Sequence, residues 1–247
     1  MSRLRESILT IGGFDPSGGA GVLADVKTFE QHKLTGLSVL TCNTVQSENQ
    51  FLSIHPIEKE IVLNQLELML KSYTIKWCKI GLINDIDLLR ETVRILKKND
   101  VRILLDPILK ASAGFDFDRD ITSLLSIIDE VDWLMPNANE ILTISGLSNV
   151  QEASEMMSQR CNVYLKGGHL DADLGKDYVY MDGSMAFSLN PMTKRASEKH
   201  GSGCILAAAL VANLTKGYTI KNACVRSKDY VSKCLDSNLT KLSFHKR

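Results

Sequence analysis

The sequence predicts an α/β fold with a mostly parallel central sheet, helices on both faces and a small hairpin at one edge. Apolar runs of strand length alternate with stretches of helical period over most of the 247 residues. Most of these runs are apolar at consecutive positions, which is typical of strands covered on both faces. No Pro-, Gly- or Ser-rich linker interrupts the alternation, so we expect residues 1–247 to form a single domain.

Six apolar runs are expected to form the body of the sheet. They are Ser7–Gly12, Leu37–Cys42, Cys78–Ile83, Val101–Leu105, Val131–Met135 and Asn162–Lys166. Two shorter runs, Tyr178–Met181 and Met185–Ser188, flank the turn sequence Asp182–Gly183–Ser184. This pattern predicts the hairpin at the sheet edge.

Amphipathic segments between the strands predict the helices. Ala20–His32, for example, places Val22, Val26 and Phe29 on one face. The other expected helices are Glu58–Tyr73, Asp87–Lys98, Val150–Arg160, Ser202–Lys216 and Thr219–Asp236. Ligands of such sheets bind beyond the carboxyl ends of the strands, so residues that follow the strands are the candidates for function.

Composition limits the possible partners and the compartment. The 29 basic and 29 acidic residues cancel, which argues against a partner such as nucleic acid or an anionic membrane. Six cysteines without a CxxC pair indicate reduced thiols rather than a disulfide scaffold or zinc ribbon. The apolar stretch Cys204–Leu214 is too short to span a bilayer, and the N-terminal run is too short for a signal peptide. We therefore expect a cytoplasmic protein.

The first strand leads into a glycine-rich segment, with five glycines between Gly12 and Gly21. Glycine permits positive φ and lets another group approach the backbone closely. The segment has neither the Walker A pattern nor a GxGxxG directly after the strand. A tight connection between strand and helix is the plain alternative to a ligand site. Asp25, one turn into the helix, could equally be a solvated side chain.

A second glycine-rich segment, Lys199–Cys204, precedes the apolar helix near the end of the chain. Free N–H groups at a helix start form an anion site, and glycines let a phosphate come close. Cys204 falls in the first helical turn, where the positive helix end favours a thiolate. The alternative is a buried cysteine in a core helix.

Polar groups follow three other strands. Asp106-Pro107, Pro136–Glu140 and Lys166–His169 each resemble an ordinary turn, and Asn139 could simply cap a helix. Together they would bring carboxylates, an amide, a lysine and an anion site to one rim of the sheet. Phosphoryl transfer uses that set of groups.

These residues resemble a known family. Thr10–Asp25 (TIGGFDPSGGAGVLAD) is similar to TIAGSDPSGGAGIQAD, the N-terminal signature of the hydroxymethylpyrimidine/phosphomethylpyrimidine kinases of thiamine biosynthesis. The other matching motifs, in the same order, are Asp25–Phe29, Thr44–Gln46, Lys79–Gly81, Asp106-Pro107, Pro136-Asn137 with Glu140, Lys166–His169 and His200–Cys204. The resemblance covers about residues 7 to 235.

The resemblance implies a ribokinase-like fold, ATP and Mg²⁺ as co-substrates, and a homodimer. At the position of Cys204, most ribokinase-like sugar kinases have an aspartate that acts as the catalytic base, whereas the pyrimidine kinases have a cysteine. Cys204 would help to take the proton of the substrate hydroxyl group. Gly201, Ser202 and Gly203 would stabilise charge on the transferred phosphoryl group.

Position by position, the resemblance also implies a pyrimidine site. Gly13, Asp25 and Gln46 match residues that contact the pyrimidine, whose amino group and ring nitrogens suit a carboxylate and an amide. Leu82 and Ile108 match apolar walls of that site.

The nucleotide and metal positions follow in the same way. Lys166, with Gly201 and Gly203, would lie near the nucleotide phosphates. Asn137 and Glu140 match the NxxE motif that organises Mg²⁺ through water, and Asp106 would join them.

The sequence departs from the family pattern at Phe14, which replaces a small residue, at Leu82, where methionine is common, and between Lys110 and Met135, which is shorter than typical. These departures bear on substrate preference. Two alternatives therefore stay open: a pyridoxal kinase of the same superfamily, and a non-catalytic vitamin-binding relative.

Overall fold

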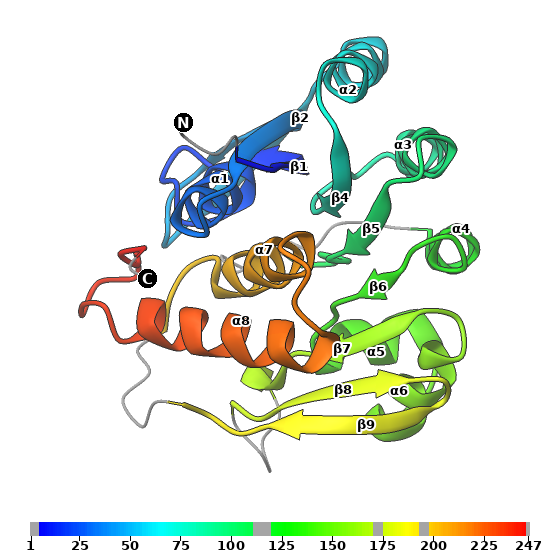
Figure 1. Ribbon diagram of the computed structural model, residues 1–247, viewed down its shortest axis with the longest axis vertical. Helices are drawn as coiled ribbons and strands as arrows, with labels where there is room; N and C mark the ends of the chain where they lie inside the picture. The colour runs from blue at the N-terminus through cyan, green and yellow to red at the C-terminus, as the bar shows by residue number, and fades with distance from the viewer. Residues whose placement is uncertain (1–4, 111–119, 170–174, 193–197, 246–247) are drawn as a thin grey trace.

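The computed structural model describes residues 5–110, 120–169, 175–192 and 198–245. Its strands form one nine-stranded sheet with the order β3-β2-β1-β4-β5-β6-β7-β8-β9 (Figure 1). Their bounds are β1 (Ser7–Phe14), β2 (Thr35–Gln46), β3 (Phe51–Pro56), β4 (Ile75–Ile80), β5 (Arg102–Leu105), β6 (Trp133–Leu134), β7 (Asn162–Leu165), β8 (Asp177–Met181) and β9 (Ser184–Leu189). The six strands from β2 to β7 in this order are parallel to one another, and β3, β8 and β9 add antiparallel edges.

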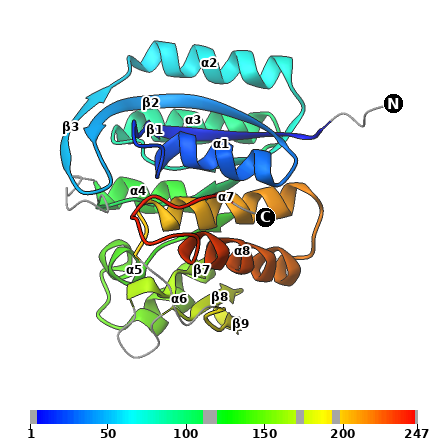
Figure 2. The same ribbon diagram turned by 90° about the vertical axis from the view of Figure 1, so that its left-hand side faces the viewer.

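Helices cover both faces of the sheet, as predicted (Figures 1 and 2). The apolar core on one face is formed with α1 (Gly21–Gln31), α7 (Ser202–Thr215) and α8 (Ile220–Leu235). The core on the other face is formed with α2 (Lys59–Ser72), α3 (Ile86–Lys98), α4 (Ile121–Ile128), α5 (Ala138–Ser145) and α6 (Val150–Ser158). A short 3₁₀ turn, Gly167–His169, follows β7.

The pleat of the central strands explains why their sequences are apolar at consecutive positions. Leu104 belongs to the core beneath α7, and its neighbour Leu105 belongs to the core beneath α3 and α4. Trp133 and Leu134 divide in the same way. Since successive side chains of a strand point to opposite faces, a sheet with two covered faces needs an apolar residue at every position.

Several elements differ from the sequence prediction. The edge hairpin is confirmed as β8 and β9, but β3 was not predicted because its side chains are half-buried or exposed and it lacks an apolar run. α4 and α5 were also missed; each has eight residues, too few for a clear helical period. β4 begins at Ile75 rather than Cys78 and ends at Ile80 rather than Ile83.

Helices α5 and α7 differ in whether a side chain caps the N–H groups of their first turn. Asn137, not Asn139, caps α5, and it forms a reciprocal capping box with Glu140. α7 instead begins at Ser202, and its N-cap residue, Gly201, has a φ of 71° and makes no side-chain capping hydrogen bond. The N–H groups of the first turn of α7 are therefore not occupied by a capping side chain.

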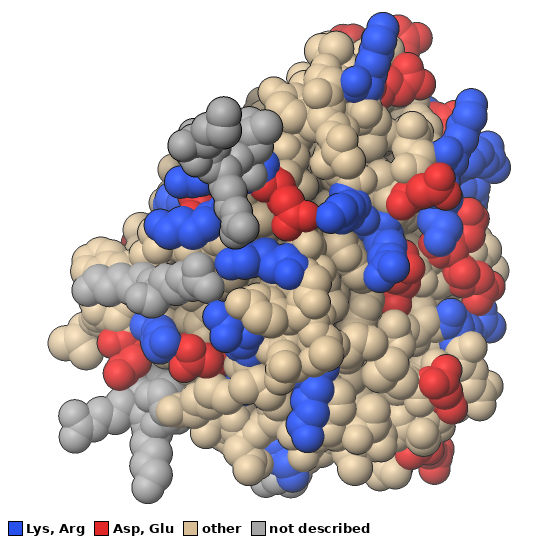
Figure 3. Space-filling model, in the orientation of Figure 1, with Lys and Arg blue, Asp and Glu red and all other residues tan. Residues whose placement is uncertain are grey.

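Other expectations from composition can be compared with the structure. All six cysteines are buried, and none of them forms a disulfide. None of the helices in the described ranges is long and apolar enough to cross a bilayer. On the face seen in Figure 3, basic and acidic side chains both occur, in keeping with the balanced composition.

Candidate active site

A cavity of about 280 Å³ opens beyond the carboxyl ends of the parallel strands. This volume is close to the lower end of the range for small-molecule pockets. Every residue to which the sequence assigned a role lines it: Gly13, Asp25, Gln46, Leu82, Asp106, Ile108, Asn137, Glu140, Lys166, Gly201, Ser202, Gly203 and Cys204. The structure thus brings together positions from β1 to α7.

The two glycine-rich segments touch each other at this cavity. A Cβ atom on Gly201 would lie 2.1 Å from the carbonyl oxygen of Gly19, and one on Gly21 would lie 2.3 Å from that of Gly13. Both residues also have positive φ values, 71° and 60°. Because neither the space nor the backbone admits a larger side chain, Gly201 is required for the contact between the segments, and Gly21 is required for the tight fold of the first segment on itself.

A buried hydrogen bond joins the same segments. His200 Nε2 lies 2.8 Å from Asp15 Oδ2. Asp15 also accepts hydrogen bonds from the Ser17 amide, the Ser17 hydroxyl and the Ala20 amide. Burial alone would raise the pKa of Asp15, but these hydrogen bonds outweigh it, so the pKa is lowered. Asp15 therefore fixes the first glycine-rich segment and anchors the second one to it.

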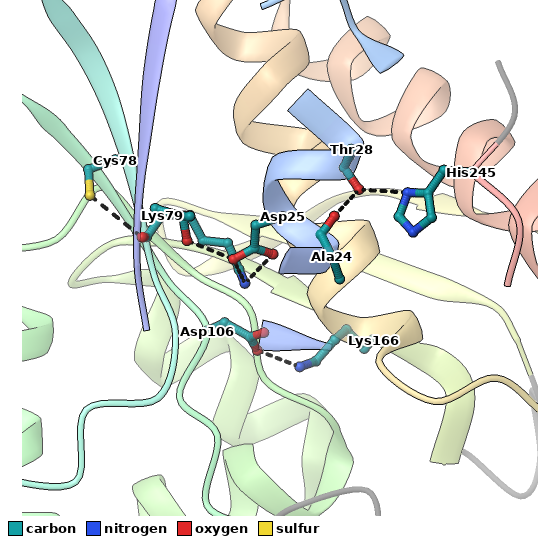
Figure 4. A network of polar contacts seen from close by, with 9 residues as sticks. Ala24, Asp25, Thr28, Cys78, Lys79, Asp106, Lys166 and His245 are labelled. Carbon is teal, nitrogen blue, oxygen red and sulfur yellow. Dashed lines mark hydrogen bonds and ion pairs between the residues drawn. The ribbon is translucent and has the colours of Figure 1, made fainter. Parts of the chain in front are cut away.

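Asp25, from α1, is paired with a lysine that the sequence analysis left without a role. Lys79 Nζ, from β4, lies 2.7 Å from both Asp25 oxygens (Figure 4). The Thr10 hydroxyl donates to Asp25 Oδ2 at 2.6 Å. Burial disfavours the charged form of Lys79, but the neighbouring negative charges, chiefly Asp25, raise its pKa. Lys79 is therefore a protonated ammonium group at the cavity wall.

A second lysine forms a parallel arrangement on the other side of the cavity. Lys166 Nζ lies 2.8 Å from Asp106 Oδ1 and 3.4 Å from Glu140 Oε2 (Figure 4). The same ammonium group would be 3.6 Å from a Cβ atom on Gly203. The carboxylates of Asp106 and Glu140 outweigh burial and raise the pKa of Lys166. The cavity wall thus carries alternating buried negative and positive groups.

Cys204 lies in the first turn of α7, between these two ion pairs. Burial raises the pKa of Cys204 to about 11, although the charge of Lys79 and a hydrogen bond with the Gly21 backbone act in the opposite direction. The expectation that the helix end favours a thiolate is therefore wrong, and the alternative of a buried cysteine in a core helix is confirmed. Desolvation of the sulfur outweighs the helix dipole, and the thiol is neutral at pH 7.

The opposite end of the cavity is more apolar. Leu82 and Ile108 belong to a small cluster with Cys42 and Phe51. A Cβ atom on Gly13 would lie 2.9 Å from the sulfur of Cys42 and 3.4 Å from Leu82, so a side chain there would fill this space.

Gln46 supplies a polar group beside that apolar end. It is the last residue of β2, where it pairs with Phe51 across a register shift in the ladder. Both residues line the cavity. Phe14, in contrast, is half-buried and is not among the lining residues.

The residues present fit Mg²⁺ only with help from other oxygen ligands. Among the described residues, no group of three or more His, Cys, Asp or Glu side chains is arranged to hold a metal ion. Asn137 uses its amide oxygen to cap α5. Asp106 and Glu140 each bind Lys166 through one oxygen and keep the other, which suits an ion that retains waters and takes phosphate oxygens.

The sequence analysis assigned no role to four charged residues that line the cavity: Lys79, Lys110, Asp177 and Lys228. Lys228 Nζ lies 2.6 Å from Asp177 Oδ2, which also accepts from the Tyr164 hydroxyl at 2.7 Å. The sequence contains a clue to the role of Lys79, because a lysine within an apolar strand needs a buried partner.

The shortened segment predicted between Lys110 and Met135 includes residues 111–119, which lie outside the described residues.

The sequence matches the family model described as phosphomethylpyrimidine kinase over residues 15–246. The chain belongs to the phosphomethylpyrimidine kinase family. Hydroxymethylpyrimidine/phosphomethylpyrimidine kinase from Haemophilus influenzae is 30% identical to it over 253 residues, which cover 97% of this chain and 94% of the relative. The predicted family is thereby confirmed.

Solved structures of the family and of its neighbours have the same fold. The phosphomethylpyrimidine kinase of Clostridium difficile has a TM-score of 0.80 and 28% identity, and the match covers 93% of this chain and 99% of that one. An ADP complex of Bacillus subtilis pyridoxal kinase has a TM-score of 0.86 and 23% identity, with 98% of each chain covered. The ribokinase-like fold expected from the resemblance is confirmed.

The lowered pKa of Asp15 predicts an acid-dependent contribution to stability. We expect Asp15→Asn to lower the free energy of unfolding at pH 7 by about 1–3 kcal/mol, because His200 and three further donors lose a charged acceptor. A lowered pKa stabilises the fold above the unfolded value of about 4, and this contribution is lost as pH falls through the folded pKa. Urea unfolding at pH 7 and pH 3 measures it. A wild-type advantage that stayed the same at both pH values would contradict the assignment.

Proposed function

We propose that this chain transfers the terminal phosphoryl group of ATP to 4-amino-5-hydroxymethyl-2-methylpyrimidine, to its monophosphate, or to both. The observation that carries the proposal is the meeting of the two glycine-rich segments at one cavity, with Cys204 at their junction. Membership of the family and the ADP complex of the Bacillus subtilis neighbour support ATP as the donor.

The pyrimidine would occupy the apolar end of the cavity. Leu82 and Ile108 offer a wall for a flat ring, and Gly13 leaves the space for it. The Gln46 amide can both donate to a ring nitrogen and accept from the exocyclic amino group. Asp25 Oδ2 already accepts from both Lys79 and Thr10, but among the described residues Oδ1 accepts from Lys79 only and keeps one lone pair for a donor of the substrate.

The phosphoryl group would pass along the start of α7. The uncapped N–H groups of Gly201, Ser202 and Gly203 would donate to its oxygens, where a helix end favours negative charge. Lys166, beside Gly203, would place an ammonium group on the nucleotide phosphates.

Mg²⁺ would supply further neutralisation of phosphate charge when bound. Asp106 and Glu140 would hold its waters through their remaining oxygens, and Asn137 would act by fixing Glu140 in the capping box.

Cys204 would receive the proton of the substrate hydroxyl group. Its raised pKa means that a small fraction of the sulfur is ionised at neutral pH, so proton transfer becomes easier as pH rises. A cytoplasmic location and a homodimer, expected from the sequence and the resemblance, stay predictions.

Substrate preference is the direct test of this proposal. ATP consumption should depend on added pyrimidine alcohol or its monophosphate, and kcat/KM for either should exceed that for pyridoxal, because the Gln46 amide matches the aminopyrimidine. A coupled assay of ADP release with the three compounds measures it. Turnover confined to pyridoxal would favour the pyridoxal kinase alternative, and binding without turnover would favour a non-catalytic relative.

Cys204 should matter for turnover more than for binding. We expect Cys204→Ala to lower kcat by about 100-fold or more and to change the pyrimidine Kd by less than about threefold. In the wild type, kcat should rise with pH from 7 towards 10, whereas Cys204→Asp should move the rise to lower pH, since a carboxylate ionises earlier. Equal losses of turnover and binding in Cys204→Ala would indicate a structural role.

Gln46 should contribute to binding of the pyrimidine but not to binding of ATP. Gln46→Ala is expected to weaken pyrimidine binding about 10-fold and to leave ATP binding unchanged, because it removes an amide beside the apolar wall only. Separate calorimetric titrations with the pyrimidine and with ATP give the two affinities. A larger loss of ATP affinity would overturn this assignment.

A further inference from the structure

The chain after α8, residues 237–245, lies across the loop that precedes α7. We call these residues the tail segment. Figure 2 shows it leaving the end of α8, passing the start of α7 and ending in front of the sheet, and Figure 1 places its end beside α1. The tail segment thus runs along the outside of both glycine-rich segments, although its own residues do not line the cavity.

The strongest contact of the tail segment is with Lys199, the residue before His200. The Lys199 side chain is 5% exposed. Its ammonium group donates to the Asn238 carbonyl oxygen at 2.6 Å, to Asn238 Oδ1 at 2.9 Å and to the Thr240 carbonyl oxygen. No carboxylate among the described residues pairs with it. A buried ammonium group that loses these neutral oxygens has no other compensation, so the contact fixes the loop strongly.

The tail segment is itself held in one conformation by Asn238. Its Oδ1 atom accepts from the Thr240 amide and from the Thr240 hydroxyl group, each at 2.8 Å. Its Nδ2 atom donates to the Leu242 carbonyl oxygen at 2.9 Å. Asn238 therefore shapes the acceptor site for Lys199 as well as taking part in it.

Further contacts connect the tail segment with the rest of the site. The His200 amide donates to the Lys241 carbonyl oxygen at 2.9 Å. The Leu242 side chain lies 2.8 Å from where a Cβ atom on Gly19 would be. His245 Nδ1 is 3.1 Å from the Tyr230 hydroxyl on α8. The tail segment thus contacts both glycine-rich segments and one of the helices that flank them.

We propose that the tail segment holds the phosphate-binding loop 199–203 in its reactive position, and that Lys199 and Asn238 are positioning residues for phosphoryl transfer. This inference rests on the proposed function. The N–H groups of Gly201 to Gly203 stabilise a transferring phosphoryl group only when they are held in place before the reaction. Asp15 secures this loop from the side of β1, and the tail segment secures it from the outside.

The experiment compares Asn238→Ala, Asn238→Asp and a control, Asn64→Ala, which removes an exposed asparagine of α2. Asn238→Ala should lower kcat about 10-fold, with less than about a threefold change in the KM for the pyrimidine. It should also weaken binding of AMP-PCP, which has a group at the position of the γ-phosphate of ATP. Binding of ADP, which lacks that group, should be unchanged. Asn238→Asp keeps the Oδ1 acceptor for Lys199 but loses the Nδ2 donor to the Leu242 carbonyl oxygen, so kcat should fall less than in Asn238→Ala.

Amide hydrogen exchange gives a readout that does not depend on turnover. In Asn238→Ala, exchange of residues 199–206 should become faster, with the strands of the sheet unchanged. Wild-type exchange and wild-type kcat in this variant would overturn the inference, and so would faster exchange throughout the sheet. If the wild-type protein transfers no phosphate to the pyrimidine or its monophosphate, the proposed function fails, while the exchange comparison still decides whether the tail segment holds the loop.

Discussion

The organisation of the site depends on one steric constraint, the contact between two glycine-rich segments that are almost 200 residues apart in the sequence. At Gly201 a single additional carbon atom would collide with the backbone of the facing segment at Gly19 and Ala20, and at Gly21 it would collide with Gly13 of its own segment. Because the approach is so close, the first turn of α7 lines the same cavity as the end of β1. The Asp15–His200 pair and the Gly21–Cys204 hydrogen bond reinforce a geometry that the glycines make possible.

Buried ion pairs form another part of the cavity wall. Burying an isolated charge is costly, and each charged group here has an opposite partner. Asp25 is matched by Lys79, and Lys166 lies between Asp106 and Glu140. These pairs contribute little to net stability by comparison with an apolar core, but they hold ammonium groups in fixed positions. A chain with no net charge can therefore present strong local fields to a phosphate.

Much of this arrangement could be predicted from the sequence, for identifiable reasons. Consecutive apolar residues in runs such as 101–105 reflect a sheet covered on both faces, and the glycine clusters mark where backbone meets backbone. The partners of buried charges could not be predicted, because Asp25 and Lys79 are 54 residues apart and only the sheet order brings them together. The protonation of Cys204 was predicted wrongly, since the helix start is visible in the sequence whereas the depth of burial is not.

The depth at which Cys204 lies has a consequence for the chemical resilience of the protein. Peroxides and alkylating reagents attack the ionised form of a cysteine, and they need access to its sulfur. Cys204 is 9% exposed, and its pKa is about 11. Shielding and protonation together make this sulfur a poor target for oxidants, so the feature that keeps the group neutral also protects it from irreversible damage.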